Sequence, residues 1–168
     1  TNKKSMKKDI DIKIYIVDDE EYYLNLEKIS LAKYKFNDIK IFNNGEECLE
    51  AIEEDEPDCV ILDYVIKTGM NGDEILKIIK EKYPDILVLV LSGQENIEVA
   101  TNIIKIGAYD YIVKNKMTFF NLNSSLSKIK EIKSKSIQIK KYNIYYILSI
   151  IVLWLFGIFS IFFLIKQF

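Results

Sequence analysis

Residues 14–19 read IYIVDD: four apolar residues, three of them β-branched, followed by two aspartates. A short run that is apolar at both parities is typical of a strand buried on both faces of a sheet. Four more runs of this kind follow along the chain. The sequence therefore predicts five strands, at 12–17, 39–42, 59–62, 86–91 and 109–113.

Amphipathic segments lie between these runs. Their apolar residues recur at the spacing of one helix face, which predicts helices at 22–34, 46–54, 73–82, 97–106 and 119–133. Strand and helix thus alternate five times in about 125 residues. This alternation predicts an α/β fold, in which right-handed crossovers build a parallel sheet with helices on both faces.

Four of the predicted strands are followed immediately by residues that can carry chemistry. Asp18 and Asp19 follow the first strand, Asp63 the third, Ser92 the fourth and Lys114 the fifth. In a parallel sheet all carboxyl ends of the strands share one edge, where ligands bind. We therefore expect three carboxylates, one hydroxyl and one ammonium group to converge at that edge.

This set of groups suits phosphoryl transfer. Three adjacent carboxylates repel one another unless a cation compensates them, and hard oxygen ligands with open positions suit Mg²⁺. A lysine and a hydroxyl can bind the remaining oxygens of a transferred phosphoryl group. A carboxylate can itself be the nucleophile and become an aspartyl phosphate. The pattern therefore predicts Mg²⁺-dependent phosphoryl acceptance by one aspartate.

Each of these residues also has an ordinary interpretation when it is taken alone. Asp18 or Asp19 would cap the helix that follows, Ser92 would serve a turn, and Lys114 would be a solvated surface lysine. Tyr111, in the fifth predicted strand, would simply pack in the core. The functional interpretation rests on their occurring together and in register.

Four segments carry a wider resemblance: IYIVDDEEYY (14–23), DCVILDYVIKTGMNG (58–72), LVLVLSG (87–93) and GAYDYIVKN (107–115). In order and spacing they match the receiver domain of bacterial two-component response regulators, which the chain resembles over residues 10–133. The resemblance implies a flavodoxin-like fold with strand order 2-1-3-4-5.

The resemblance also implies roles and partners. Asp63 would accept the phosphoryl group from a phosphohistidine on a sensor histidine kinase or a histidine phosphotransfer protein. Such a domain catalyses its own phosphorylation and dephosphorylation and is not a kinase. The implied Mg²⁺ ligands are Asp18, Asp19, Asp63 and the backbone carbonyl of Val65; Ser92 and Lys114 would bind phosphoryl oxygens, and Tyr111 would change rotamer together with Ser92.

The sequence departs from the family pattern at three places. Asn115 stands where the family usually has a proline in a cis peptide. The stretch 63–72 is one residue longer than usual and has Lys67 in place of the usual proline. Gly93 stands where alanine is common. These departures motivate an alternative, a non-phosphorylated pseudo-receiver that acts as a membrane scaffold.

Composition excludes several other classes of function. The chain has no histidine, so it contains no histidine-based triad, no histidine metal ligand and no phosphohistidine of its own. All 23 cationic residues are lysines, which excludes bidentate guanidinium contacts. Cys48 and Cys59 are too few for a disulfide framework or a zinc site. Residues 9–110 carry a net charge of −14, which argues against nucleic acid binding by this part.

A hydrophobic segment lies near the C-terminus. Residues 144–165 read IYYILSIIVLWLFGIFSIFFLI, which are 22 residues without a charge. As a helix they would span about 33 Å, the thickness of a bilayer core. Six lysines lie within 128–141 and only Lys166 follows the segment. The positive-inside rule therefore predicts that the preceding domain faces the cytoplasm.

The predicted organisation is a tail at 1–9 (disordered or a cloning remnant), a receiver domain at 10–133, a basic juxtamembrane neck at 134–142 and a transmembrane helix at 143–166. We expect a single-pass protein of the inner membrane. Because only the neck and the span follow the receiver, we expect signalling by contact with another protein rather than by DNA binding, and a protein in the membrane is one candidate partner.

Overall fold

The computed structural model describes residues 10–67 and 69–166, with the backbone alone at 159–164. The predicted tail at 1–9 lies outside the described residues. Strands and helices alternate along the chain, as predicted. In chain order they are β1 (Ile14–Val17), α1 (Glu21–Lys33), β2 (Ile39–Phe42), α2 (Gly45–Glu54), β3 (Cys59–Asp63), α3 (Gly72–Lys82), β4 (Leu87–Ser92), α4 (Ile97–Ile106), β5 (Asp110–Val113) and α5 (Thr118–Lys166).

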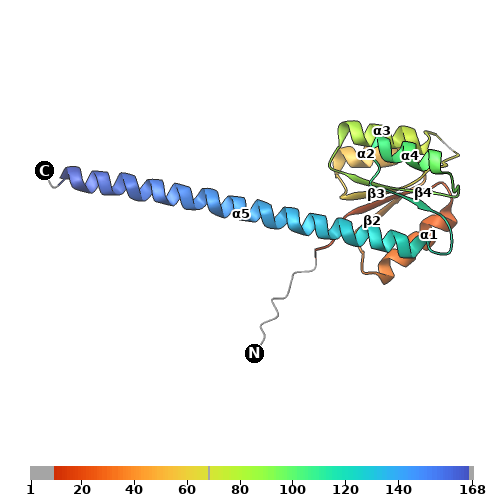
Figure 1. Cartoon of the computed structure of the whole chain (residues 1–168), viewed down its shortest axis with the longest axis horizontal. Coiled ribbons are helices and arrows are strands. Elements are labelled where there is room, and N and C mark those ends of the chain that lie inside the picture. Colours follow the sequence, from red (N-terminus) through yellow and green to blue (C-terminus); the bar gives the residue numbers. More distant parts are fainter. Residues whose placement is uncertain (1–9, 68, 167–168) are drawn as a thin grey trace, which may run out of the picture. The chain divides into compact units, whose positions relative to one another are not determined.

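The five strands form one parallel sheet in the order β2-β1-β3-β4-β5, which confirms the predicted topology. Figure 1 shows α2, α3 and α4 together on one face of the sheet. On the other face, Leu122 and Leu126 at the start of α5 belong to the same buried cluster as Leu24 of α1. Helices therefore cover both faces, as right-handed crossovers require.

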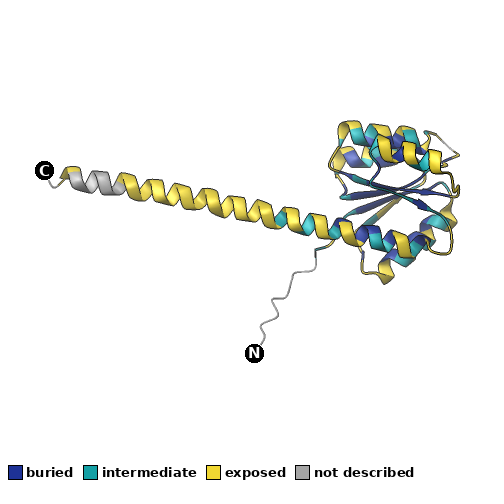
Figure 2. Cartoon of the chain, in the orientation of Figure 1, coloured by how far each residue is buried: buried dark blue, intermediate teal, exposed yellow. Residues whose placement is uncertain are grey.

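Alternate residues of β1 contribute to two separate cores. Tyr15 and Val17 pack in a cluster with residues of α2, α3 and α4, whereas Ile14 and Ile16 pack in a cluster with residues of α1 and α5. All four side chains are fully buried, and Figure 2 shows the strands of the central sheet coloured mostly as buried. Burial on both faces is the physical reason that this run is apolar at both parities.

The ends of β3 and β4 position two of the predicted site residues. β3 includes Asp63 and β4 includes Ser92, so the predicted strands at 59–62 and 86–91 each end one residue too early. The parallel register places Asp63 beside Leu91 and Ser92 beside Val113. Both polar side chains are thus held by strand hydrogen bonding at the carboxyl edge of the sheet.

Gly72 starts α3 in close contact with the backbone of this edge. A Cβ atom at this position would lie 2.7 Å from the backbone oxygen of Asp63 and 2.9 Å from the Cα of Tyr64. Only glycine allows so close an approach. The start of α3 therefore packs directly on the residue that ends β3.

Helix α5 is continuous, and it joins the predicted helix at 119–133, the predicted neck at 134–142 and the predicted apolar helix at 143–166. Pro57 and Pro84, the only prolines of the chain, both precede it, and it contains one glycine, Gly157. Contacts divide the chain into two compact units, which meet between Glu131 and Ile132. In the second unit every residue from 138 to 158 is exposed (Figure 2), and by length and composition this helix could cross a membrane.

Candidate functional site

Three aspartates meet at the carboxyl edge of the sheet. Asp18 and Asp19 follow β1, and Asp63 ends the neighbouring strand β3. One carboxylate oxygen of each lies within 4.8 Å of the others. Asp18 is only 1% exposed, and Asp63 is also buried. The structure therefore brings together the three carboxylates that the strand ends predict.

Lys114 provides a positive charge to this acidic cluster. It follows β5, and its Nζ lies 2.6 Å from Asp18 Oδ2 and 3.1 Å from Asp63 Oδ1. The backbone N–H of Lys114 donates to the carbonyl of Ser92, at 2.7 Å, which holds the base of the side chain against β4. Burial acts to lower the pKa of Lys114, but its hydrogen bonds and charge interactions with the two aspartates outweigh this and raise it. The ammonium form is thereby stabilised.

The carboxyl group of Asp63 holds its proton more readily than an exposed aspartate does. Burial raises its pKa, and the negative charge of Asp18 adds to this effect. The ammonium of Lys114 and a hydrogen bond from the backbone N–H of Val65 act in the opposite direction without cancelling the increase. A second cation near Asp63 would complete the compensation of charge.

Asp19 has one oxygen that can bind such a cation. Its Oδ1 is buried and has no hydrogen-bond partner among the described residues. Its Oδ2 accepts a hydrogen bond from the backbone N–H of Lys67 at 3.1 Å, and the Lys67 ammonium pairs with Glu20 at 2.7 Å. Carboxylate oxygens are the ligands that a hard divalent cation prefers. The donor set at this edge therefore fits such an ion.

Val65 lies in the loop after β3 and is 45% exposed. Its backbone N–H is hydrogen-bonded to the carboxylate of Asp63. This contact fixes the loop close to the acids. The predicted metal contact of the Val65 carbonyl remains a prediction.

Ser92 and Tyr111 are connected through Gln94. The buried Ser92 Oγ accepts a hydrogen bond from the backbone N–H of Gln94 at 3.1 Å. The Tyr111 hydroxyl donates to the backbone carbonyl of the same residue at 2.8 Å. The side chain of Tyr111 is half-buried and is thus fastened to the loop between β4 and α4. One loop residue therefore joins the two residues of the predicted switch.

Asn115 organises the turn between β5 and α5. Its side-chain Oδ1 accepts from the N–H of Met117 at 2.7 Å, and its own N–H donates to Thr118 Oγ1 at 2.6 Å. Among residues 10–67 and 69–166 no peptide bond is cis, so the Lys114–Asn115 bond is trans. The turn is held by hydrogen bonds to a polar side chain where the family pattern has a proline.

Glu27 is a buried carboxyl group that sequence reasoning missed. It is 2% exposed and lies on α1 between the buried residues Leu24 and Leu31. Burial, followed by the negative charge of Asp18, raises its pKa to about 8. Glu27 follows Leu24 by three residues and precedes Leu31 by four, which is the spacing of one helix face. That spacing was the available signal for its burial.

Comparisons with known proteins agree with this geometry. A sequence model described as "Response regulator receiver domain" matches residues 14–120. A response regulator of Rickettsia conorii, described as NtrX-like, is 36% identical over 130 residues. This alignment covers 76% of the chain and 27% of the relative, so the chain spans about a quarter of the relative's length.

Solved receiver domains have the same fold. The receiver domain of NtrX from Brucella abortus has a TM-score of 0.65 and 29% identity, over 71% of this chain and 98% of that chain. A BeF3-activated receiver domain of DrrB, a Thermotoga maritima protein, has a TM-score of 0.65 and 27% identity, over 73% and 99%. The similarity thus extends over almost the whole of each solved domain.

Proposed function

Because the chain belongs to the response regulator receiver domain family, we propose that Asp63 accepts a phosphoryl group from a phosphohistidine on a histidine kinase or a phosphotransfer protein. The observation that carries this proposal is the position of Lys114, which contacts both Asp18 and Asp63. A lysine so placed can bind an oxygen of a phosphoryl group attached to Asp63. The 168 residues contain no histidine, which is consistent with a phosphohistidine donor on a second protein.

The acidic cluster would bind Mg²⁺. Asp18, Asp19 and Asp63 offer oxygens close together, and the unpartnered Oδ1 of Asp19 supports this assignment. The Val65 carbonyl would be a further ligand. Bound there, Mg²⁺ would supply compensation for the negative charges of the acids and of the incoming phosphoryl group.

In the transfer step, a carboxylate oxygen of Asp63 forms a bond to phosphorus. The bond between phosphorus and the donor imidazole nitrogen breaks, and its electron pair stays on that nitrogen. Lys114 holds a negatively charged phosphoryl oxygen. Ser92 Oγ already accepts the N–H of Gln94, which leaves the hydroxyl hydrogen to donate to another phosphoryl oxygen.

The signal would pass from Ser92 to Tyr111. When the Ser92 hydroxyl donates to a phosphoryl oxygen, the hydrogen bond that its Oγ accepts from the Gln94 N–H changes direction. Because the Tyr111 hydroxyl is bonded to the carbonyl of Gln94, the loop and the tyrosine respond together. A rearrangement at the surface formed by α4 and β5 then reports phosphorylation to a partner protein.

We further propose that residues 143–166 anchor the receiver in the inner membrane, with the receiver on the cytoplasmic side. The exposed apolar helix supports the anchor, and the lysines that precede it support the orientation. In this arrangement the output is contact with another protein rather than with DNA.

The proposal is tested with the full chain in mild detergent, incubated with acetyl phosphate and Mg²⁺. Intact mass should show the gain of one phosphoryl group that hydroxylamine removes. Asp63→Asn should abolish the gain, and Asp85→Asn, at an exposed position outside the cluster, should retain it. Absence of the gain in folded wild-type protein would overturn the proposal.

That negative result would favour the pseudo-receiver scaffold. One observation already supports the scaffold as the second candidate, because Lys67 binds Asp19 through its N–H and places an ammonium beside Glu20. A positive charge at this rim opposes the binding of a metal cation. If the scaffold is correct, Mg²⁺ should fail to bind to wild-type protein.

A further inference from the structure

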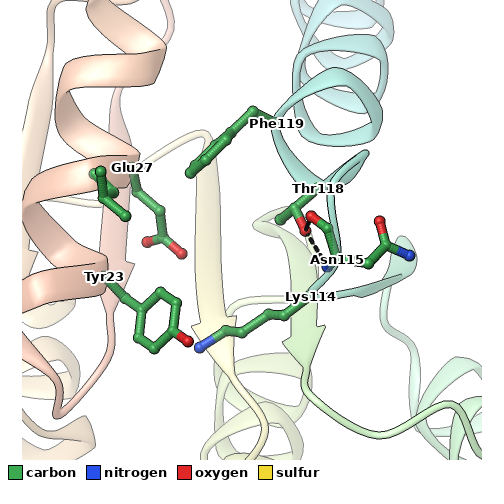
Figure 3. Close-up of a pocket in the computed structure, with 7 residues that line it drawn as sticks. Tyr23, Glu27, Lys114, Asn115, Thr118 and Phe119 are labelled. Carbon is green, nitrogen blue, oxygen red and sulfur yellow. Dashed lines mark hydrogen bonds between the residues drawn. The ribbon is translucent and has the colours of Figure 1, made fainter.

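A pocket of about 240 Å³ lies beside the acidic cluster, between α1 and the start of α5 (Figure 3). Exposed Asn115 lies at its rim, and buried Glu27 and Thr118 lie at its inner end. Lys114 contributes both to this pocket and to the candidate phosphorylation site. The full lining consists of Tyr23, Leu26, Glu27, Lys114, Asn115, Thr118 and Phe119.

The inner end of the pocket holds an unpartnered carboxyl oxygen. Glu27 Oε2 is buried and has no hydrogen-bond partner among the described residues. Figure 3 shows the carboxyl group of Glu27 directed into the space between α1 and Lys114. A buried polar oxygen without a partner is unfavourable by about 1–3 kcal/mol, and burial raises the pKa of Glu27 to about 8, so the group is largely protonated at neutral pH. A ligand that donates hydrogen bonds to Glu27 would remove this penalty.

The walls of the pocket are aromatic. The rings of Tyr23 and Phe119 lie on either side of the Glu27 carboxyl group (Figure 3). The Tyr23 ring already accepts a cation, since Lys114 Nζ lies 4.5 Å from its centroid. Aromatic rings bind flat apolar groups and attract positive charge.

The charges around the pocket favour a cation over an anion. Lys114 is the one positive group in the lining, and its charge is already paired with Asp18 and Asp63. Glu27 adds a carboxyl group that makes no ion pair with Lys114, and one of its oxygens has no hydrogen-bond partner among the described residues. An anion would therefore meet a net negative potential, and a cation would be attracted.

We propose that this pocket binds a small organic cation, namely an amidinium or ammonium group on a flat aromatic body, with its N–H groups donating to Glu27. The volume limits the size, because pockets for drug-sized ligands start at about 300 Å³. A molecule of the size of benzamidine satisfies this limit. Its planar amidinium can form two parallel hydrogen bonds to a carboxylate.

Binding would influence the neighbouring site through Lys114. A cation on Glu27 lies close to the lysine ammonium and favours its displacement toward Asp63. By linkage, phosphorylation would change the affinity of the pocket by the same factor. This coupling rests on the proposed function, whereas binding of the cation itself does not.

The test is isothermal titration of benzamidine into the full chain in detergent near pH 9, above the pKa of about 8 of Glu27, without a phosphodonor. We expect saturable binding to one site and about tenfold weaker binding by Glu27→Gln, which keeps the size of the side chain and loses the charge. Glu46→Gln is the matched control, because Glu46 also has a buried unpartnered oxygen but lies on α2, outside this pocket. Benzoate, an anion of the same shape, should not bind.

The proposal would be overturned if benzamidine did not bind to the wild-type protein, or if it bound to Glu27→Gln as tightly as to wild type. It would also be overturned if benzoate bound as tightly as benzamidine. A second measurement needs no variant: benzamidine ring protons should show nuclear Overhauser effects to the rings of Tyr23 and Phe119. Contacts confined to other aromatic residues would also overturn it. Acetyl phosphate labelling is scored separately by mass, so failure of the pocket and failure of phosphorylation are distinguished.

Discussion

Lys114 Nζ lies 2.6 Å from Asp18 Oδ2, although 96 positions separate the two residues in the chain. The same ammonium lies 3.1 Å from Asp63 Oδ1. Lys114 is therefore the protein's own counterion for two acids that are also the predicted ligands of a metal ion. The lysine and the metal ion compete electrostatically for the same negative charge, and this competition can be measured.

Substitution Lys114→Met should make Mg²⁺ bind several-fold more tightly, because Asp18 and Asp63 both lose the ammonium group that pairs with them in the metal-free protein. Phosphorylation by acetyl phosphate should become slower, because the group that binds the phosphoryl oxygen is lost. Calorimetric titration with Mg²⁺ and time courses of intact mass measure the two effects. Lys105→Met, on the exposed side of α4, is the control. Weaker Mg²⁺ binding by Lys114→Met would contradict the competition.

Mg²⁺ should raise the midpoint of thermal unfolding of the wild-type receiver, because a ligand that binds only the folded state stabilises it. Asp19→Asn should lose most of this increase, since the buried Oδ1 of Asp19 is an available ligand atom. Chelation with EDTA should return wild type to the metal-free midpoint. Near-UV circular dichroism follows the transition, with Asp85→Asn as the control. An equal increase in Asp19→Asn would remove Asp19 from the set of ligands.

Glu27→Gln should stabilise the metal-free protein increasingly as the pH rises. The pKa of Glu27 is about 8 in the folded protein, above its ordinary value of 4.5. The folded state therefore binds more protons than the unfolded state between these values, and wild type loses stability as the pH rises through this interval. Glutamine has no proton to lose. The free energy of unfolding should therefore favour the variant by about 5 kcal/mol near pH 9, with almost no difference near pH 4.

Denaturant unfolding at a series of pH values measures this difference. Glu46→Gln, which also removes a partly buried carboxyl group but lies on α2, is the control. A constant difference between wild type and Glu27→Gln at all pH values would show that Glu27 does not change protonation on unfolding.

Tyr111→Phe should separate phosphorylation from its structural response. The variant loses the hydrogen bond from the Tyr111 hydroxyl to the Gln94 carbonyl, at a cost of about 1 kcal/mol. Asp63 and Lys114 are untouched, so phosphorylation should continue at nearly the wild-type rate. The change in hydrogen exchange of the loop 93–96 on phosphorylation should decrease. Tyr109→Phe is the control, and an unchanged loop response in Tyr111→Phe would contradict the proposed switch.

The membrane anchor makes a prediction of its own. Wild-type protein expressed in bacteria should stay with the membrane fraction after carbonate extraction. Replacing both Leu153 and Trp154 with lysine should release it, because each lysine near the centre of a span is unfavourable by about 2.5–3.5 kcal/mol. Replacing Gln138 and Ile139 with lysine, before the span, is the control. Release of wild-type protein by carbonate would contradict a transmembrane helix.

Much of the fold was predictable because its signal is local. Strands buried on both faces must be apolar at both parities, and β1 and β3 show this without interruption. The strand order followed from the family resemblance. The continuity of α5 through the neck at 134–142 was not predicted, because the amphipathic pattern stops at residue 133 while the residues that follow remain compatible with a helix.

The candidate site was predictable where residues follow strands directly. Asp18, Asp63 and Lys114 follow or end strands, and the parallel topology brings them together. Glu27 was missed because a charged residue on an amphipathic helix is normally assigned to the solvent side, whereas its burial depends on packing around Lys114 and Phe119. The contacts of Lys67 with Asp19 and Glu20 depend on a loop conformation that spacing alone does not reveal.

The order of the strands also has a consequence for how the protein is made. β1 and β3 leave the ribosome before β5, and about 50 residues separate Asp63 from Lys114. At about 5–20 residues per second, the nascent chain carries its three clustered aspartates for several seconds before the lysine is synthesised. Their mutual repulsion opposes closure of the partial sheet during this interval. Lys114, which directly follows the last strand to be translated, then supplies a positive charge that compensates part of this repulsion.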